Sequence, residues 1–158
     1  MKITNEEVTS KQHGLKAESN NEILNSLVKE TITLNGQLGQ IFKNRIDELK
    51  PVIEVLRKNN YYFKYPDNEC EGMSTRGPII DYNNNHYFVY SIDEDSVYKV
   101  NNFNTDSSEK IHFLNFIKQW DFEKAMNGLN YVLELQERFA EIHKKNQIDM
   151  RALIDKYS

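Results

Sequence analysis

The sequence predicts an α+β fold in which two long antiparallel helices, amphipathic or coiled-coil in pattern, flank a small antiparallel β-meander, with one short helix in addition. Two observations lead to this fold class. Apolar residues recur at helical spacing over a long stretch near each end of the chain, and the segment between them alternates with a period of two. The 158 residues fit one domain, which we place at residues 19–158. Residues 1–18 lack a sustained period and are predicted to form a flexible N-terminal tail.

The first long helix is predicted over residues 20–58. Ser19 and Glu22 have the spacing of a capping box at its start, and a pair of asparagines follows its last residue. Pro51 removes one helical hydrogen bond, but the apolar pattern continues in phase beyond it, so we expect a kink. The alternative is a break into two helices at Lys50. One face is apolar throughout; it contains Ile23, Leu24, Leu27, Val28, Leu34, Leu38, Ile41, Phe42, Ile46, Leu49, Val52, Ile53 and Leu56.

The second long helix is predicted over residues 121–157, with Asp121 as its N-cap. Its apolar positions alternate steps of four and three, which is typical of a coiled coil. Because polar residues interrupt both seams and the first stripe is wide, we expect two such helix pairs to associate into a four-helix bundle, giving a homodimer. The residues predicted to line this oligomer seam are Leu34, Leu38, Leu129, Leu133, His143 and Met150.

The middle segment is predicted to be a meander over residues 60–102. Its expected strands are short stretches rich in Tyr, Phe, Val and Ile, at residues 60–65, 78–82, 86–92 and 96–101. The asparagines at 83–85 and the acids at 93–95 supply the turns between strands. Residues 66–77 form a long loop, and a short helix is predicted over residues 107–119.

The middle segment also contains the net negative charge of the chain. Residues 59–106 hold three Lys or Arg against eight acids, and seven of the nine tyrosines lie between residues 61 and 98. Tyrosine gives a large, rigid contact area with a polar tip, so the sheet and loop 66–77 are predicted to bind a protein partner with a basic surface. The alternative is that the rings only cover both faces of a small sheet. The predicted partner-binding residues are Tyr82, Tyr87, Tyr90, Asp93, Glu94, Asp95 and Tyr98.

The sequence gives no support for catalysis, so no catalytic residue, metal site or cofactor is predicted. Cys70 lies between two glutamates, which would suppress its thiolate form, and the four histidines are scattered without metal-ligand spacing. Asp67 and Asp81 could be imagined in a metal-dependent nuclease, but acids in turns are usually just solvated. Direct nucleic-acid binding is disfavoured because the middle segment repels phosphates.

We therefore expect a non-enzymatic protein-binding or regulatory protein. By analogy, an acidic surface suits a phage or mobile-element inhibitor that engages a basic partner. The alternatives are a structural or assembly coiled-coil protein and, less favoured, a nucleic-acid binder or nuclease. Acids near the start replace the apolar stretch of a signal peptide, no apolar run could span a membrane, and the lone cysteine fits a reducing compartment, so the expected location is the cytoplasm. The abundance of Asn together with Lys and Ile, which is common in AT-rich bacterial and phage genomes, suggests a bacterial host.

Overall fold

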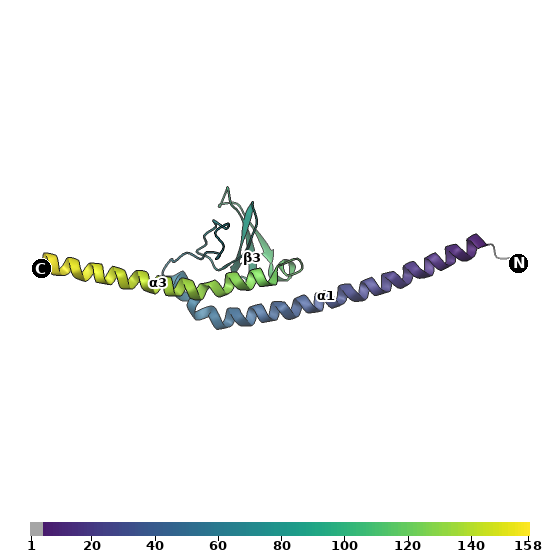
Figure 1. The fold of residues 1–158 in the computed structure, drawn as a ribbon, viewed down its shortest axis with the longest axis horizontal. Coiled ribbons are helices and arrows are strands. Elements are labelled where there is room, and N and C mark those ends of the chain that lie inside the picture. The colour runs from purple at the N-terminus through teal and green to yellow at the C-terminus, as the bar shows by residue number, and fades with distance from the viewer. Residues whose placement is uncertain (1–4) are drawn as a thin grey trace. The chain divides into compact units, whose positions relative to one another are not determined.

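The computed structural model describes residues 5–158 and has an α+β fold (Figure 1). Its helices are α1 (Asn5–Lys58), α2 (Phe113–Phe116) and α3 (Phe122–Tyr157), and one antiparallel sheet lies between α1 and α2 in the chain. The α+β class is therefore confirmed. The chain divides into two compact units, one ending at Leu38 and the other spanning Gly39–Ser158. The single domain expected over residues 19–158 stays a prediction.

Helix α1 begins at Asn5, whereas the prediction placed its start at residue 20. Residues 5–18 contain mostly good helix formers with acids at the beginning, so they extend the helix without needing an apolar period. The other residues of the expected tail, 1–4, lie outside the described part. The helix runs through Pro51 and ends where Asn60 takes a positive φ of 55°. There the Tyr61 and Asn60 N–H groups donate to the carbonyls of Leu56 and Arg57, as in a Schellman motif.

The sheet is a meander of four strands in the order β1 (Ile79–Tyr82), β2 (His86–Ser91), β3 (Ser96–Asn101) and β4 (Ser108–His112). The meander and its last three predicted strands agree with the prediction, but its first strand does not. Residues 60–65 contribute only an isolated bridge between Phe63 and Ser74. The fourth strand is Ser108–His112, which was predicted to open a helix over 107–119; it pairs with β3, so the helix shrinks to Phe113–Phe116.

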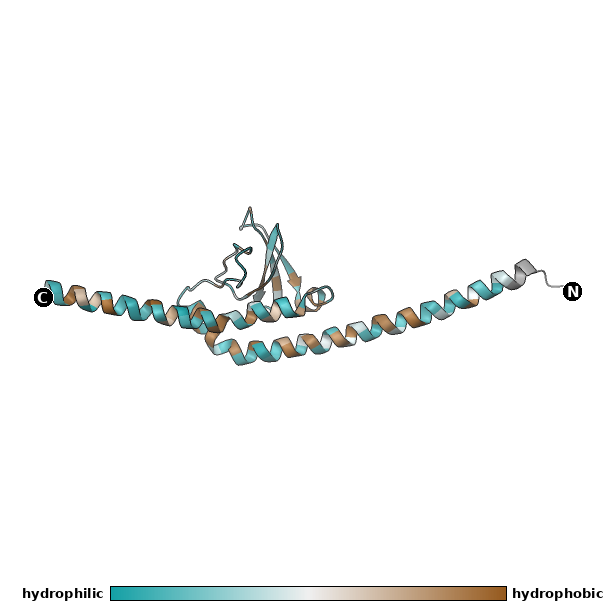
Figure 2. Cartoon of the chain, in the orientation of Figure 1, coloured by the Kyte–Doolittle hydropathy of each residue, from teal (hydrophilic) through white to brown (hydrophobic). Residues whose placement is uncertain are grey.

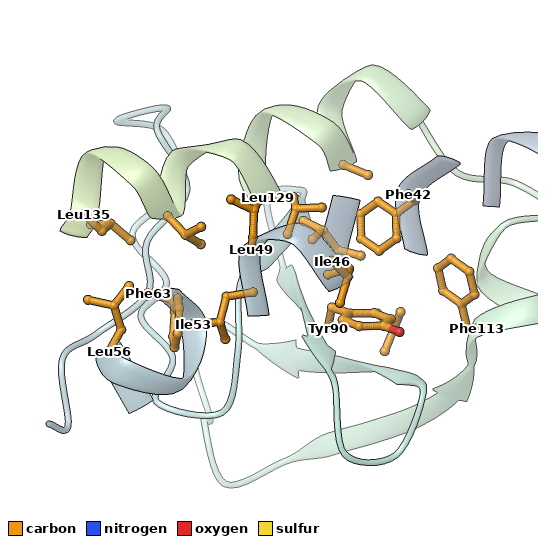
Figure 3. Close-up of a cluster of buried hydrophobic side chains, with 14 of the residues drawn as sticks. Phe42, Ile46, Leu49, Ile53, Leu56, Phe63, Tyr90, Phe113, Leu129 and Leu135 are labelled. Atoms are coloured by element: carbon orange, nitrogen blue, oxygen red, sulfur yellow. The ribbon is translucent and has the colours of Figure 1, made fainter. Parts of the chain in front are cut away.

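One face of the sheet, which we call the inner face, packs on α1 and α3 around the larger of two hydrophobic clusters (Figure 3). Gly128 of α3 approaches β1 so closely that an added Cβ would lie 2.1 Å from the Ile79 carbonyl oxygen. In the same helix Leu129 is fully buried, whereas Leu133 is 39% exposed. The core residues on the two helices are Phe42, Ile46, Leu49, Ile53, Leu56, Ala125, Leu129, Val132 and Leu135.

The opposite face, which we call the outer face, is covered by the loop at residues 66–77. Tyr65 and Cys70 at this loop pack on a smaller cluster formed by Tyr87, Val89 and other side chains of the sheet. The backbone at Gly72 lies against the Tyr87 ring, where an added Cβ would meet ring carbons at 2.6 Å. Both faces of the sheet are thus occupied by the protein's own chain.

Candidate partner-binding site

The acidic turn between β2 and β3 is held by two cations of α1. Arg57 Nη2 lies 2.7 Å from Asp93 Oδ2, and Lys43 Nζ lies 2.8 Å from Asp95 Oδ2. Asp95 also accepts a hydrogen bond from the Tyr90 hydroxyl at 2.8 Å and has a positive φ of 47°. Two acids that were predicted to meet a basic partner are therefore neutralised inside the chain.

The protonation of these groups follows from their neighbours. The hydrogen bond from Arg57 lowers the pKa of Asp93. Burial works against ionisation of Asp95, but the hydrogen bonds from Lys43 and Tyr90 outweigh it and lower the Asp95 pKa. Burial and the bond to Asp95 raise the pKa of Tyr90. At neutral pH the turn therefore consists of ionised acids and a neutral phenol, which is a stable structural arrangement.

Two of the predicted binding tyrosines are buried. Tyr90 points into the inner-face core, with its ring centroid 5.4 Å from that of Phe42, and only 3% of it is exposed. Tyr87 is 5% exposed in the outer-face cluster, and its hydroxyl donates to the Met73 carbonyl at 3.2 Å. The helices cover Tyr90 on one face of the sheet, and loop 66–77 covers most of Tyr87 on the other, where Tyr87 also lines the hollow described below. For these two rings the alternative, that they fill the faces of a small sheet, describes the structure.

The other predicted residues are more accessible, but they also bond to one another. The Tyr98 hydroxyl donates to the Glu94 carboxylate, and Lys110 lies 3.6 Å from the same carboxylate. The Arg76 guanidinium stacks 3.8 Å from the centroid of the half-buried Tyr98 ring. Hydrogen bonding to Tyr98 lowers the pKa of Glu94, so this acid is ionised above the acidic range. Glu94 and Tyr98 form a surface pair at the edge of the outer face.

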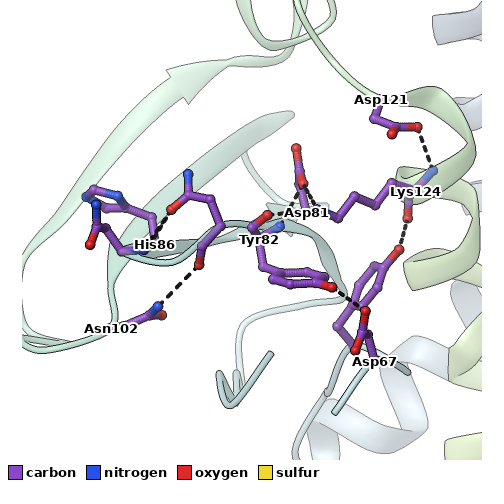
Figure 4. A network of polar contacts seen from close by, with 10 residues as sticks. Asp67, Asp81, Tyr82, His86, Asn102, Asp121 and Lys124 are labelled. Carbon is purple, nitrogen blue, oxygen red and sulfur yellow. Dashed lines mark hydrogen bonds and ion pairs between the residues drawn. The ribbon is translucent and has the colours of Figure 1, made fainter. Parts of the chain in front are cut away.

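Tyr82 belongs to a polar network that ties loop 66–77 and β1 to α3 (Figure 4). Lys124 lies 3.1 Å from Asp81 and 3.9 Å from the Tyr82 ring centroid, and the Tyr82 hydroxyl donates to Asp67. The Tyr65 hydroxyl donates to the Lys124 carbonyl at 2.8 Å, and burial with the nearby Asp81 raises the Tyr65 pKa to about 12. These contacts fix the loop in place and so define the walls of the site described next.

A hollow of about 510 Å³ opens on the outer face, between loop 66–77, the turn after β1 and the loop after β3. It continues into a second hollow of about 250 Å³, with which it shares Met73, Tyr87 and Thr105 and which ends at Arg76 and Tyr98. The larger hollow is lined by Glu69, Glu71, Gly72, Met73, Asn83, Asn84, Tyr87, Asn102, Phe103 and Thr105.

The rim of this hollow combines exposed apolar side chains with free acids. Phe103 is 85% exposed and Met73 is 49% exposed. Glu69 and Glu71 are exposed and make no ion pair with any residue that the structure describes. Sequence reasoning pointed to loop 66–77 but missed Phe103. The signal was a single phenylalanine inside the polar run NNFNTD, where a turn has no structural need for a large apolar ring.

Other kinds of site find no support in the described residues. No group of three His, Cys, Asp or Glu side chains within residues 5–158 could hold a metal ion. Cys70 is a free, half-buried cysteine, and burial raises the pKa of its thiol. The same range contains no helix with the length and apolar character required to cross a membrane.

The residues of the predicted oligomer seam do not share one environment. Leu129 is fully buried within its own chain, because it faces the core under β1, so it cannot belong to a contact between copies. Leu34 is 50% and Met150 is 54% exposed, and His143 is exposed beside Phe139 with 4.4 Å between ring centroids. Leu38 is half-buried.

Comparison of the chain with protein-family models, with curated proteins and with solved structures found no match. The function is therefore argued from the geometry of the chain.

Proposed function

We propose that this chain is a non-enzymatic binding protein that holds a partner in the outer-face hollow. The observation that carries the proposal is the pairing of two exposed apolar side chains, Phe103 and Met73, with the free acids Glu69 and Glu71 on one rim. Exposed apolar patches rimmed by polar residues mark interaction sites, and aromatic anchors supply most of the affinity in protein interfaces.

The chemistry of the rim fits a partner segment that carries an apolar side chain next to Lys or Arg. Fully burying Phe103 and Met73 contributes up to about 1.5–3 kcal/mol each, whereas rim charges mainly affect the association rate and specificity. The acids available for this role lie in loop 66–77, since those of the 93–95 turn are engaged with α1 and with Lys110. The proposed binding surface therefore uses the acids of loop 66–77 in place of those of the 93–95 turn, and it is still negatively charged.

The cellular location and the biological role are part of the same proposal. The net negative charge of residues 59–106 and the free Cys70 support a regulator acting in the cytoplasm of a bacterial host. An inhibitor from a phage or mobile element, which would present acids to the basic surface of its target, fits this chemistry.

The hollow can be tested with a display library of random peptides. We expect selected peptides to combine Lys or Arg with an aromatic or aliphatic residue. Replacing Phe103→Ala together with Met73→Ala should weaken them at least about tenfold in fluorescence anisotropy, since about 1.4 kcal/mol corresponds to a factor of ten. Leu114→Ala is the matched control, because Leu114 is 58% exposed but does not line the hollow. Equal binding by the double variant and the control would reject this site.

A second candidate function, assembly through the long helices, is favoured by exposed apolar residues on both of them (Figure 2). Their coiled-coil pairing into a homodimer, with a seam that no longer contains Leu129, remains a proposal. Half-exposed aliphatic side chains at heptad spacing favour self-association. On α1 they are Leu24, Leu27 and Leu34, and the exposed apolar residues at the same spacing on α3 are Met150, Ile154 and Tyr157.

Light scattering of the full chain at tens of micromolar should therefore show an oligomer. Replacing Leu27→Glu together with Leu34→Glu should give a monomer, because four carboxylates would meet at the contact between two copies. Ser26→Glu with Thr33→Glu adds the same charge at positions outside the seam and should leave the oligomer intact. A monomeric native chain would exclude the assembly function.

A further inference from the structure

We infer that residues 17–38 of α1 pair with the same residues of a second copy of this chain, parallel and in register. This inference rests on the assembly function proposed above and names the surface that performs it. It is independent of the outer-face hollow, so either can fail without the other.

The first observation is a heptad seam on α1 that has no cover in its own unit. The unit that ends at Leu38 is formed, in its described part, by α1 alone, so no other element of that unit can bury the seam. Leu24, Leu27 and Leu34 are 57%, 55% and 50% exposed. Steps of three and four alternate along the seam residues Ala17, Asn20, Leu24, Leu27, Thr31, Leu34 and Leu38.

The flanks of the seam are compatible with a second copy. The seam residues take the a and d positions of a heptad. In a parallel coiled coil, the g position, just before an a residue, faces the e position, just after the following d residue, of the partner helix. Ile23 would then meet Val28 of the copy, which adds an apolar contact on each side. Lys16 and Glu30 would face the neutral amides of Asn21 and Asn35, so no like charges meet.

The polar residues of the seam, Asn20 and Thr31, are also compatible with a parallel pair. The Thr31 hydroxyl donates to the Leu27 carbonyl of its own helix at 3.0 Å, so its hydrogen bond is already made and its methyl group can face the copy. In register, Asn20 meets Asn20 of the copy, and two amides can bond to each other, as buried asparagines do when they set the register of a coiled coil.

The pairing of seam residues also determines whether the two helices are parallel or antiparallel. An antiparallel pair within residues 17–38 would place Leu24 against Leu34 of the copy and Leu38 against Asn20. The Leu38–Asn20 pair, which occurs twice in such a contact, would bury an amide against an aliphatic side chain without a partner. The parallel pair instead sets apolar against apolar and polar against polar. About three heptads, roughly 33 Å of helix, then form a contact near the lower size limit of specific interfaces, so dissociation at low concentration is expected.

The test uses the full chain with Cys70→Ser, so that any disulfide comes from an added cysteine. Ala17→Cys lies at the end of the seam, and a parallel pair brings the two sulfurs together, whereas the antiparallel pair separates them by about 36 Å. Under mild oxidation at tens of micromolar we expect most of this variant to run as a covalent dimer in non-reducing electrophoresis. Glu18→Cys, one residue further on and facing away, is the matched control and should stay uncrosslinked.

Each outcome decides the matter. Crosslinking of Ala17→Cys alone supports the parallel α1 pair. Equal crosslinking of both variants would indicate random collision and overturn it. An oligomer in light scattering without crosslinking of Ala17→Cys would overturn the pairing but leave the assembly function in place. A chain that stays monomeric throughout would overturn both.

Discussion

Replacing Gly128→Ala is expected to lower the free energy of unfolding by about 2–3 kcal/mol, because overpacking a tight contact costs about that much. The added Cβ would lie 2.1 Å from the Ile79 carbonyl oxygen and 3.0 Å from the Tyr65 ring. A backbone oxygen cannot move aside as a flexible side chain does, so α3 must separate from β1. This cost exceeds the gain of about 1 kcal/mol that alanine brings to a helix. Urea denaturation followed by circular dichroism measures the difference.

Gly36→Ala is the control for this change, since an added Cβ at Gly36 meets nothing within 4 Å. Here only the helical preference of alanine acts, so helix content should stay equal or rise. If Gly128→Ala proved as stable as Gly36→Ala, the close approach of α3 to β1 would be refuted.

Replacing Phe42→Ala is expected to cost about 3–5 kcal/mol, the range for truncating a buried aromatic side chain. Phe42 is fully buried, and its ring centroid lies 5.4 Å from Tyr90, 5.5 Å from Phe113 and 5.6 Å from Trp120. One residue therefore joins α1, the sheet and the segment before α3. A loss of this size is a large part of the total stability of a small domain, about 5–15 kcal/mol.

Trp120 is the only tryptophan of the chain and contacts Phe42, so its fluorescence reports on this core during urea unfolding. The neighbouring Ile41 is 51% exposed, and Ile41→Ala should change stability by no more than about 1 kcal/mol. Similar midpoints for the two variants would contradict the central position of Phe42.

Much of the fold could be predicted because its signals are local. The period of 3.6 located α3 and residues 20–58 of α1, and the period of two with its Asn and Asp turns located β1, β2 and β3. The same signals could not show that residues 60–65 would stay outside the sheet or that Ser108–His112 would form its fourth strand. The first segment has the stronger β propensity, but the second follows β3 closely enough to pair with it. Hydrogen bonding to β3 therefore outweighed the intrinsic β propensity of the two segments.

The candidate site was harder to predict, because its contacts join residues far apart in the chain. The acids at 93–95 are conspicuous in the sequence, yet Arg57 and Lys43, which neutralise two of them, lie on α1. Alternation could show that Tyr87 and Tyr90 point to opposite faces, but not that both faces would be covered. The cover on the outer face is loop 66–77, which has no periodic signal. The same loop leaves Met73 and the two glutamates at the surface.

The edge strand β4 has a consequence for the behaviour of the protein at high concentration. Its outer side presents unpaired backbone groups, which invite addition of a strand from another molecule and growth of fibrils. Glu109 and Lys110 are exposed in the middle of this strand, and strongly hydrated charges oppose such stacking. These two charges therefore protect the open edge of the sheet from amyloid-like growth when the protein is concentrated.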